Sequence, residues 1–258
     1  MIIVDKLCYS SRLRYMNAGE KFAFAIITLL ICVVSRSILC AAVILAATAI
    51  LTVKIGGIPL SRYRTLMAVP LTFILLSTLA IIVNFSHTPL DAFAIPLGSI
   101  YVTGSWHGIY RAFQLIITAM AAVSCLYFLS LNTPMTDILE VLRRLRCPLL
   151  FIELMMLIYR FLFVLLEIAS SITTSQRSRL GNKDLKTAYH SFSNMVSVLF
   201  VRAIKKSNAL FDAMESRCYD GRIRVLNETF PPKAKEIIAI VCFEVFLLIC
   251  IIGGKLLL

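Results

Sequence analysis

Six apolar stretches that approach or reach the ~20 residues needed to cross a bilayer as a helix dominate this chain. Breaks marked by charge, proline or glycine separate them. The stretches are Phe22–Val34, Ile38–Val53, Leu66–Val83, Ala112–Leu131, Leu149–Ile172 and Ile237–Ile252. With 59% hydrophobic residues and a mean hydropathy of +0.87, the chain is also far more apolar than a soluble domain. The sequence therefore predicts an all-α integral membrane protein.

The positive charges predict how the chain is oriented in the membrane. Lysine and arginine number four in residues 1–21, three in 54–65, three in 132–148 and twelve in 169–235. Such excesses are typical of cytoplasmic segments, so we expect all four inside, together with the N-terminus. The segment 84–107 contains neither lysine nor arginine, which suits an exoplasmic loop.

The stretch Leu149–Ile172 conflicts with a simple alternation of spans, because crossing would carry the segment with twelve charges to the outside. Glu153, Arg160 and Glu167 recur along it at seven-residue spacing, which places them on one stripe of a helix. Such a stripe is costly against lipid but suits an amphipathic helix or a buried seam. We therefore expect a helix at or below the cytoplasmic surface. A sixth span with a buried Glu/Arg pair is the alternative.

These expectations give about five transmembrane helices and a cytoplasmic or interfacial unit of amphipathic helices. The predicted parts are N-terminal transmembrane helices at 1–132, the cytoplasmic unit at 133–227 and a C-terminal transmembrane helix at 228–258. Within the cytoplasmic unit, a short helix begins near Thr133, where threonine and proline form a helix start. Two long helices follow it. One is expected from about Leu149 to Arg179, and the other begins near Leu185 and places an apolar stripe that includes Phe192 and Val196 at mostly three- and four-residue steps.

The two long helices are expected to end in the same way. Each finishes in a serine, an arginine and a terminating glycine close behind. The endings are Ser178-Arg179-Leu180-Gly181 and Ser216-Arg217-Cys218 followed by Tyr219-Asp220-Gly221. We expect Gly181 and Gly221 to adopt positive φ just beyond the helices, so that each arginine lies at an exposed tip.

Paired arginines at helix ends allow several functions. The helix dipole favours one such arginine by ~0.3–1 kcal/mol, so a single instance carries little information. Two matched guanidinium groups could instead enter grooves on a soluble partner with two similar sites, because the planar fork binds carboxylates and carbonyls bidentately. Contact with lipid phosphates and plain helix termination are the alternatives that the spacing leaves open.

The stretches around these arginines resemble the paired signatures of a known family. Ser175-Gln176-Arg177-Ser178-Arg179-Leu180-Gly181 and Ala213-Met214-Glu215-Ser216-Arg217-Cys218-Tyr219-Asp220-Gly221 are similar to those of the transmembrane T component of energy-coupling factor transporters. The resemblance is to the CbiQ type, which serves cobalt uptake. It covers nearly the whole chain, from the basic N-terminal segment to the closing apolar helix.

The resemblance implies a coupling subunit whose cytoplasmic helices bind two ABC-type ATPase subunits and whose membrane partner holds the substrate. It implies that Arg179 and Arg217 each enter a groove on an ATPase, with Ser178, Leu180, Ser216 and Cys218 flanking them. Family motifs usually have alanine before the arginine and glycine or serine after it, so Leu180 is the clearest departure. A multi-pass protein of the bacterial inner membrane is implied, with cobalt as substrate and nickel or a vitamin as alternatives.

Motifs for catalysis and for cofactor binding are missing from the sequence. No GxxxxGK[ST] phosphate loop is present, so ATP is expected to be hydrolysed by other subunits. The three histidines, at 87, 107 and 190, are isolated from other ligands, and no metal site is expected on this chain. The net charge of +12 follows the cytoplasmic segments, which suits anionic lipid and a protein partner better than nucleic acid.

Two other classes of function fit the sequence less well than a coupling subunit. An intramembrane enzyme would have to use Glu153, Arg160 and Glu167 with Tyr159, which form no nucleophile-and-base or metal pattern. A self-contained secondary transporter should show internal repeats and broken helices with polar residues at mid-membrane, and no such repeat is found. We therefore expect a non-enzymatic coupling subunit without a cofactor.

Overall fold

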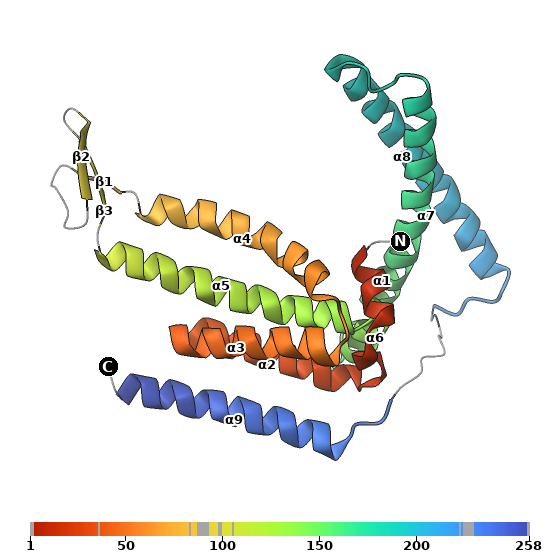
Figure 1. Cartoon of the computed structure of the whole chain (residues 1–258). Helices are drawn as coiled ribbons and strands as arrows, with labels where there is room; N and C mark the ends of the chain where they lie inside the picture. The colour runs from red at the N-terminus through yellow and green to blue at the C-terminus, as the bar shows by residue number, and fades with distance from the viewer. Residues whose placement is uncertain are drawn as a thin grey trace. The chain divides into compact units, whose positions relative to one another are not determined.

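The computed structural model describes residues 3–35, 37–82, 84–86, 93–97, 100–104, 106–221, 223 and 230–256 (Figure 1). The chain divides into two compact units. We call residues 2–138 and 228–258 the membrane unit, and residues 139–227 the motif unit because they contain both arginine-bearing helix ends.

The membrane unit is built from helices that pack against one another. They are α1 (Ile3–Ser10), the 3₁₀ turn η1 (Arg12–Tyr15), α2 (Ala18–Ser35), α3 (Ile38–Ile50), the π-helical turn η2 (Leu51–Ile55), α4 (Leu60–Ile82), α5 (Trp106–Asn132), the start of α6 (Met135–Arg144) and α9 (Ala234–Leu256). Helix α5 packs against α2, α3 and α4, and α9 packs against α2 and α3. A buried cluster of small and apolar side chains joins these helices: Cys32, Ala41, Ile44, Ala121, Cys125 and Leu247.

A small antiparallel sheet connects α4 to α5. Its strands are β1 (Asn84–Ser86), β2 (Phe93–Leu97) and β3 (Ile100–Gly104), in the order β1-β3-β2. The register pairs Asn84 with Thr103 and Phe93 with Gly104. The sequence predicts only a loop here, because three strands of at most five residues carry too short an alternation to be recognised.

Five helices of the described chain are long and apolar enough to cross a membrane. They are α2, α3 extended through η2 (Ile38–Ile55), α4, most of α5 (Gly108–Asn132) and α7 (Leu149–Ser178). The predicted all-α, multi-pass membrane fold is confirmed. The predicted set of spans counted the closing helix in place of α7, and the position of α7 at the cytoplasmic surface stays a prediction.

The motif unit consists of the end of α6, the 30-residue helix α7 and the 31-residue helix α8 (Leu185–Glu215), which packs against α7. None of the α8 side chains is buried. Its apolar stripe, predicted from three- and four-residue steps, is therefore open in this chain, with Phe192 59% and Val196 46% exposed. Large exposed apolar faces mark surfaces that contact a membrane or a partner.

Candidate functional site

The first arginine-bearing end closes α7. The helix stops at Ser178, and the backbone N–H of Gly181 donates to the carbonyl of Gln176 at 2.8 Å while that of Leu180 donates to Arg177 at 3.1 Å. Leu180 has a φ of 58°, in the left-handed region. A left-handed residue with a hydrogen bond across five positions is the Schellman ending of a helix.

The second arginine-bearing end closes α8 in the same way. The N–H of Tyr219 donates to the carbonyl of Met214 at 3.1 Å, and that of Cys218 donates to Glu215 at 2.9 Å. Cys218 has a φ of 57°. The arginine therefore directly precedes the left-handed residue in both ends, which gives Arg179 and Arg217 equivalent places at their helix termini.

The serines before the arginines also behave alike. The hydroxyl of Ser178 donates to the carbonyl of Thr174 at 3.0 Å, and that of Ser216 donates to Asp212 at 2.7 Å. Each hydroxyl thereby donates to the carbonyl four residues earlier in its last turn, and the Asp212 carbonyl also accepts the backbone N–H of Ser216 at 3.0 Å. All six motif side chains are exposed, namely Ser178, Arg179, Leu180, Ser216, Arg217 and Cys218.

The guanidinium groups of Arg179 and Arg217 are available for a partner. Within the described part of the chain, neither of them makes an ion pair or a side-chain hydrogen bond. A helix C-terminus favours a cation there, but the two heads remain solvated and carry their full donor sets. The structure thus presents two exposed, chemically matched donor groups.

The two terminating glycines differ from each other. Gly221 has a φ of 81°, as predicted. The prediction for Gly181 is wrong, because the left-handed residue of the first end is Leu180, one position earlier. Gly181 is required for a different reason: a Cβ atom there would lie 2.8 Å from both the Gln176 carbonyl oxygen and the Ser191 hydroxyl.

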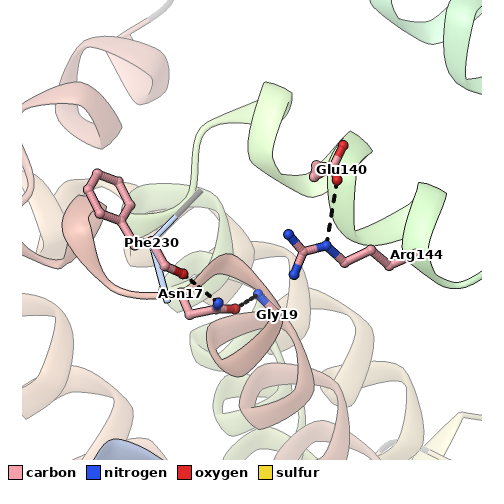
Figure 2. Close-up of polar contacts among 5 residues, drawn as sticks. All are labelled: Asn17, Gly19, Glu140, Arg144 and Phe230. Atoms are coloured by element: carbon pink, nitrogen blue, oxygen red, sulfur yellow. Dashed lines mark hydrogen bonds and ion pairs between the residues drawn. The ribbon is translucent and has the colours of Figure 1, made fainter. Parts of the chain in front are cut away.

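A third helix of the chain ends with the same geometry. At the end of α6, Arg146 has a φ of 61°, and the N–H of Cys147 donates to the carbonyl of Leu142 at 3.1 Å. Figure 2 shows the ion pair of this helix, in which Arg144 and Glu140 lie 3.5 Å apart at i,i+4 spacing. The left-handed helix ending thus occurs at α6, α7 and α8. The two candidate sites differ from the end of α6 in having a serine before the arginine.

Each candidate site is attached to the neighbouring helix of the motif unit. At the first, the side-chain amide of Gln176 donates to the Ser191 carbonyl at 2.7 Å, and the Ser191 hydroxyl donates to the Gly181 carbonyl at 2.8 Å. At the second, Tyr219 donates through its hydroxyl to Glu153 of α7 at 2.9 Å. That hydrogen bond to a carboxylate, more than desolvation, raises the pKa of Tyr219.

The side chains of Glu153, Arg160 and Glu167, which the spacing places on one stripe of the helix, differ in burial. Glu153 is buried with 5% exposure, whereas Arg160 and Glu167 are exposed. The sequence did not reveal the hydrogen bonds of Glu153, because their donors lie 66 and 70 positions away.

The sequence also did not reveal a buried polar cluster in the membrane unit. The Lys21 ammonium donates to the carbonyls of Leu13 and Asn132, and the Ser11 hydroxyl donates to the Asn132 side-chain oxygen at 2.7 Å. The Asn132 amide donates to Phe128 at 2.8 Å. Nearby in sequence, Asn17 caps α2 by accepting from Gly19 at 2.8 Å and donates to the Phe230 carbonyl at 2.7 Å (Figure 2).

The described residues offer no metal site. Among them, no three His, Cys, Asp or Glu side chains gather closely enough to bind a metal ion. His190 is exposed on α8, and the side chains of the histidines at 87 and 107 lie outside the described residues. The arrangement presents two exposed arginines whose guanidinium groups can donate hydrogen bonds to a partner.

Comparison with known proteins gives a family and several relatives. The family model described as cobalt transport protein, CbiQ, matches residues 10–228. The chain is 26% identical over 219 residues to the cobalt transport protein CbiQ of Salmonella typhimurium, with 84% of this chain and 97% of that protein covered. It is 31% identical over 256 residues to a fused cobalt transport protein CbiMQ of Methanocorpusculum labreanum, covering 98% of this chain and 42% of the fused one.

A shorter similarity reaches the wider transporter class. Over 115 residues, 43% of each chain, the sequence is 32% identical to the energy-coupling factor transporter transmembrane protein EcfT of Ruminiclostridium cellulolyticum. The matched region of the family model contains both arginine-bearing helix ends.

Proposed function

This chain belongs to the CbiQ family of cobalt transport proteins, and from that premise we propose that it couples ATP hydrolysis to cobalt uptake in an energy-coupling factor transporter. In this function, two ABC-type ATPase subunits bind the ends of α7 and α8. A separate membrane subunit holds the divalent cobalt and is moved by the motif unit.

The observation that carries the proposal is the equivalence of the two helix ends. Arg179 and Arg217 precede left-handed residues in identical hydrogen-bonded turns, and both project without partners among the described residues. Two equal donor groups suit two equal acceptor sites, such as the grooves of a pair of identical or homologous ATPases. The guanidinium fork can bind carbonyls or carboxylates there bidentately.

The open apolar faces of the motif unit support a second, membrane-embedded partner. Between α7 and α8 lies an apolar groove of about 540 Å³, lined by residues that include Phe161, Leu165 and Leu199. The fused relative is named as a CbiM and CbiQ protein in one chain, which supports a substrate-binding partner of the CbiM kind for this chain. The same membership in a transport family supports a non-catalytic role.

Co-purification combined with transport tests the proposal. The wild-type chain, expressed with its ATPase and substrate-binding subunits, should retain two ATPase chains and support cobalt uptake. The double variant Arg179→Ala with Arg217→Ala should insert normally, with thermal stability nearly unchanged because both heads are exposed. It should lose uptake and ATPase association, since truncating one partner of a buried charged contact costs ~2–5 kcal/mol.

The matched control changes an arginine outside the two ends. Arg160 is exposed on α7 and is absent from both turns, so Arg160→Ala should leave uptake and ATPase recovery at wild-type levels. Unchanged uptake and ATPase recovery in the double variant would mean that these are ordinary helix ends, and the proposal would be abandoned.

A further inference from the structure

The buried carboxylate of Glu153 has no place in the function proposed so far. Of the α7 side chains, Ile152 and Glu153 are the buried ones. Removing a carboxylate from water is unfavourable unless hydrogen bonds replace the lost hydration. The position of Glu153 therefore needs a structural reason.

Both oxygens of Glu153 accept hydrogen bonds from the chain that follows α8. Oε2 accepts from the Tyr219 hydroxyl at 2.9 Å, and Oε1 accepts from the backbone N–H of Ile223 at 2.9 Å. These donors lie on either side of Gly221, whose φ of 81° turns the chain between them. One carboxylate thus holds both arms of the turn against α7.

The first residue that hydrogen-bonds to Glu153 is Tyr219, two residues after Arg217. The backbone of Tyr219 closes α8 through its bond to Met214, while its side chain reaches Glu153 on α7. Tyr219 therefore connects the end of one helix to the other. Because Arg217 lies inside the closed turn, any rotation of that turn changes the direction in which the guanidinium projects.

We propose that Glu153 is a positioning residue that directs Arg217 toward its ATPase by holding the Tyr219 side chain and the Ile223 backbone. The inference rests on the proposed docking of the two helix ends. The first end is held by the neutral groups of Gln176 and Ser191, so loss of the carboxylate should affect the second end alone.

Cysteine protection in the assembled complex tests this inference. Cys218 is exposed beside Arg217 and should be shielded from N-ethylmaleimide by a docked ATPase. A Leu180→Cys substitution places an equivalent probe at the first end, in the same left-handed position. Alkylation of each site is followed over time by peptide mass spectrometry in the complex of all subunits.

Two variants weaken these hydrogen bonds, one by changing the acceptor Glu153 and one by removing the donor of Tyr219. In Glu153→Gln the amide presents one acceptor to two donors, so one contact is lost. In Tyr219→Phe one donor is removed while α7 stays unchanged, so this variant carries the test even where the glutamine variant assembles poorly. Glu167→Gln makes the same chemical change at an exposed site of α7 and is the control.

In both weakened variants, Cys218 should be alkylated about tenfold faster than in the wild-type complex, because a hydrogen bond to a charged group commonly shifts a local equilibrium by that order. Cobalt uptake should fall in parallel, and the probe at position 180 should stay protected. Equal protection of Cys218 in all variants would overturn the role of Glu153 while leaving the proposed function intact. An unprotected Cys218 in a wild-type complex that retains its ATPases would instead contradict docking at the second end.

Discussion

The ammonium group of Lys21 donates to the backbone carbonyl of Asn132 at 2.9 Å, across 111 positions of the sequence. Both residues are fully enclosed in the membrane unit. Asn132 is the last residue of α5, so this contact fixes the point at which the bundle leads into α6. The lysine acts here as a bridge between two backbone carbonyls.

Replacing this lysine should destabilise the membrane unit. Lys21→Met leaves the carbonyls of Leu13 and Asn132 buried without a donor, at a cost of about 2–4 kcal/mol. Thermal unfolding of the purified subunit in detergent measures the loss. Lys6→Met, at an exposed site of α1, should leave the unfolding temperature nearly unchanged, and equal temperatures for both variants would contradict the bridging role.

Glycine at the left-handed positions should stabilise the motif unit. A side chain in the left-handed region costs ~1–2 kcal/mol, part of which is offset because glycine loses more entropy on folding. Leu180→Gly and Cys218→Gly are therefore each expected to raise the free energy of unfolding by about 0.5–1 kcal/mol. Ser178→Gly, inside the helix, should lower the free energy of unfolding. A lower free energy of unfolding in all three variants would contradict the expected stabilisation of the turns.

The two glycines behind the arginines should respond differently to alanine. At Gly181 the new Cβ would collide with the Gln176 carbonyl and the Ser191 hydroxyl, so the turn must open. At Gly221 no atom of the described residues lies within 4 Å of the added Cβ, so the expected cost is the strain of the positive φ, about 1 kcal/mol. Gly181→Ala should thus reduce stability and ATPase recovery more than Gly221→Ala, and the reverse order would exclude the close contact.

Two native cysteines should differ sharply in reactivity. Burial raises the pKa of the Cys8 thiol to about 12, and the thiolate is the reacting form. Because this pKa is raised, Cys8 stays protonated at pH 8 and should react only after unfolding. Cys218 is exposed and should be alkylated rapidly in the isolated subunit. Equal rates at pH 8, measured by peptide mass spectrometry, would contradict the burial of Cys8.

Membrane orientation can be tested with single cysteines in a cysteine-free chain. A cysteine at position 182 should be protected from an impermeant reagent in intact cells, because the positive charges predict that the motif unit is cytoplasmic. One at position 88, outside the described residues, should be labelled. Labelling at 182 from outside would show that α7 crosses the membrane.

The sequence predicted the helices well where their signals are local. Helix α7 was expected from Leu149 to about Arg179 and spans Leu149–Ser178, and α8 was expected near Leu185 and begins there. Apolar periodicity and terminating residues lie within one or two turns of the boundaries they set. The equivalence of the two arginine-bearing ends followed from the same local patterns, whereas their role in binding ATPases stays a prediction.

The exact left-handed residue of a turn, and the features that depend on distant partners, were not predictable. Glycine is the usual left-handed residue, so the pattern pointed to Gly181, while the hydrogen bonds of the turn place Leu180 there. The partners of Glu153 and Lys21 are set by packing between helices far apart in the chain. One sequence shows a charged residue in an apolar stretch but not which backbone group it meets.

The π-helical turn η2 constrains how many residues the chain can have between α3 and Gly56. The N–H of Gly56 reaches back five residues to the Leu51 carbonyl at 2.8 Å, and a Cβ at Gly56 would lie 2.6 Å from the Asn132 side-chain oxygen. A π turn holds one residue more than the α-helical turn it replaces. Deleting one residue of Leu51–Ile55 would restore regular α-helix and rotate Gly56 by about 100° away from Asn132. Homologous chains that keep this contact should therefore keep the inserted residue, and an alignment gap here would mark a chain whose α5 end is held differently.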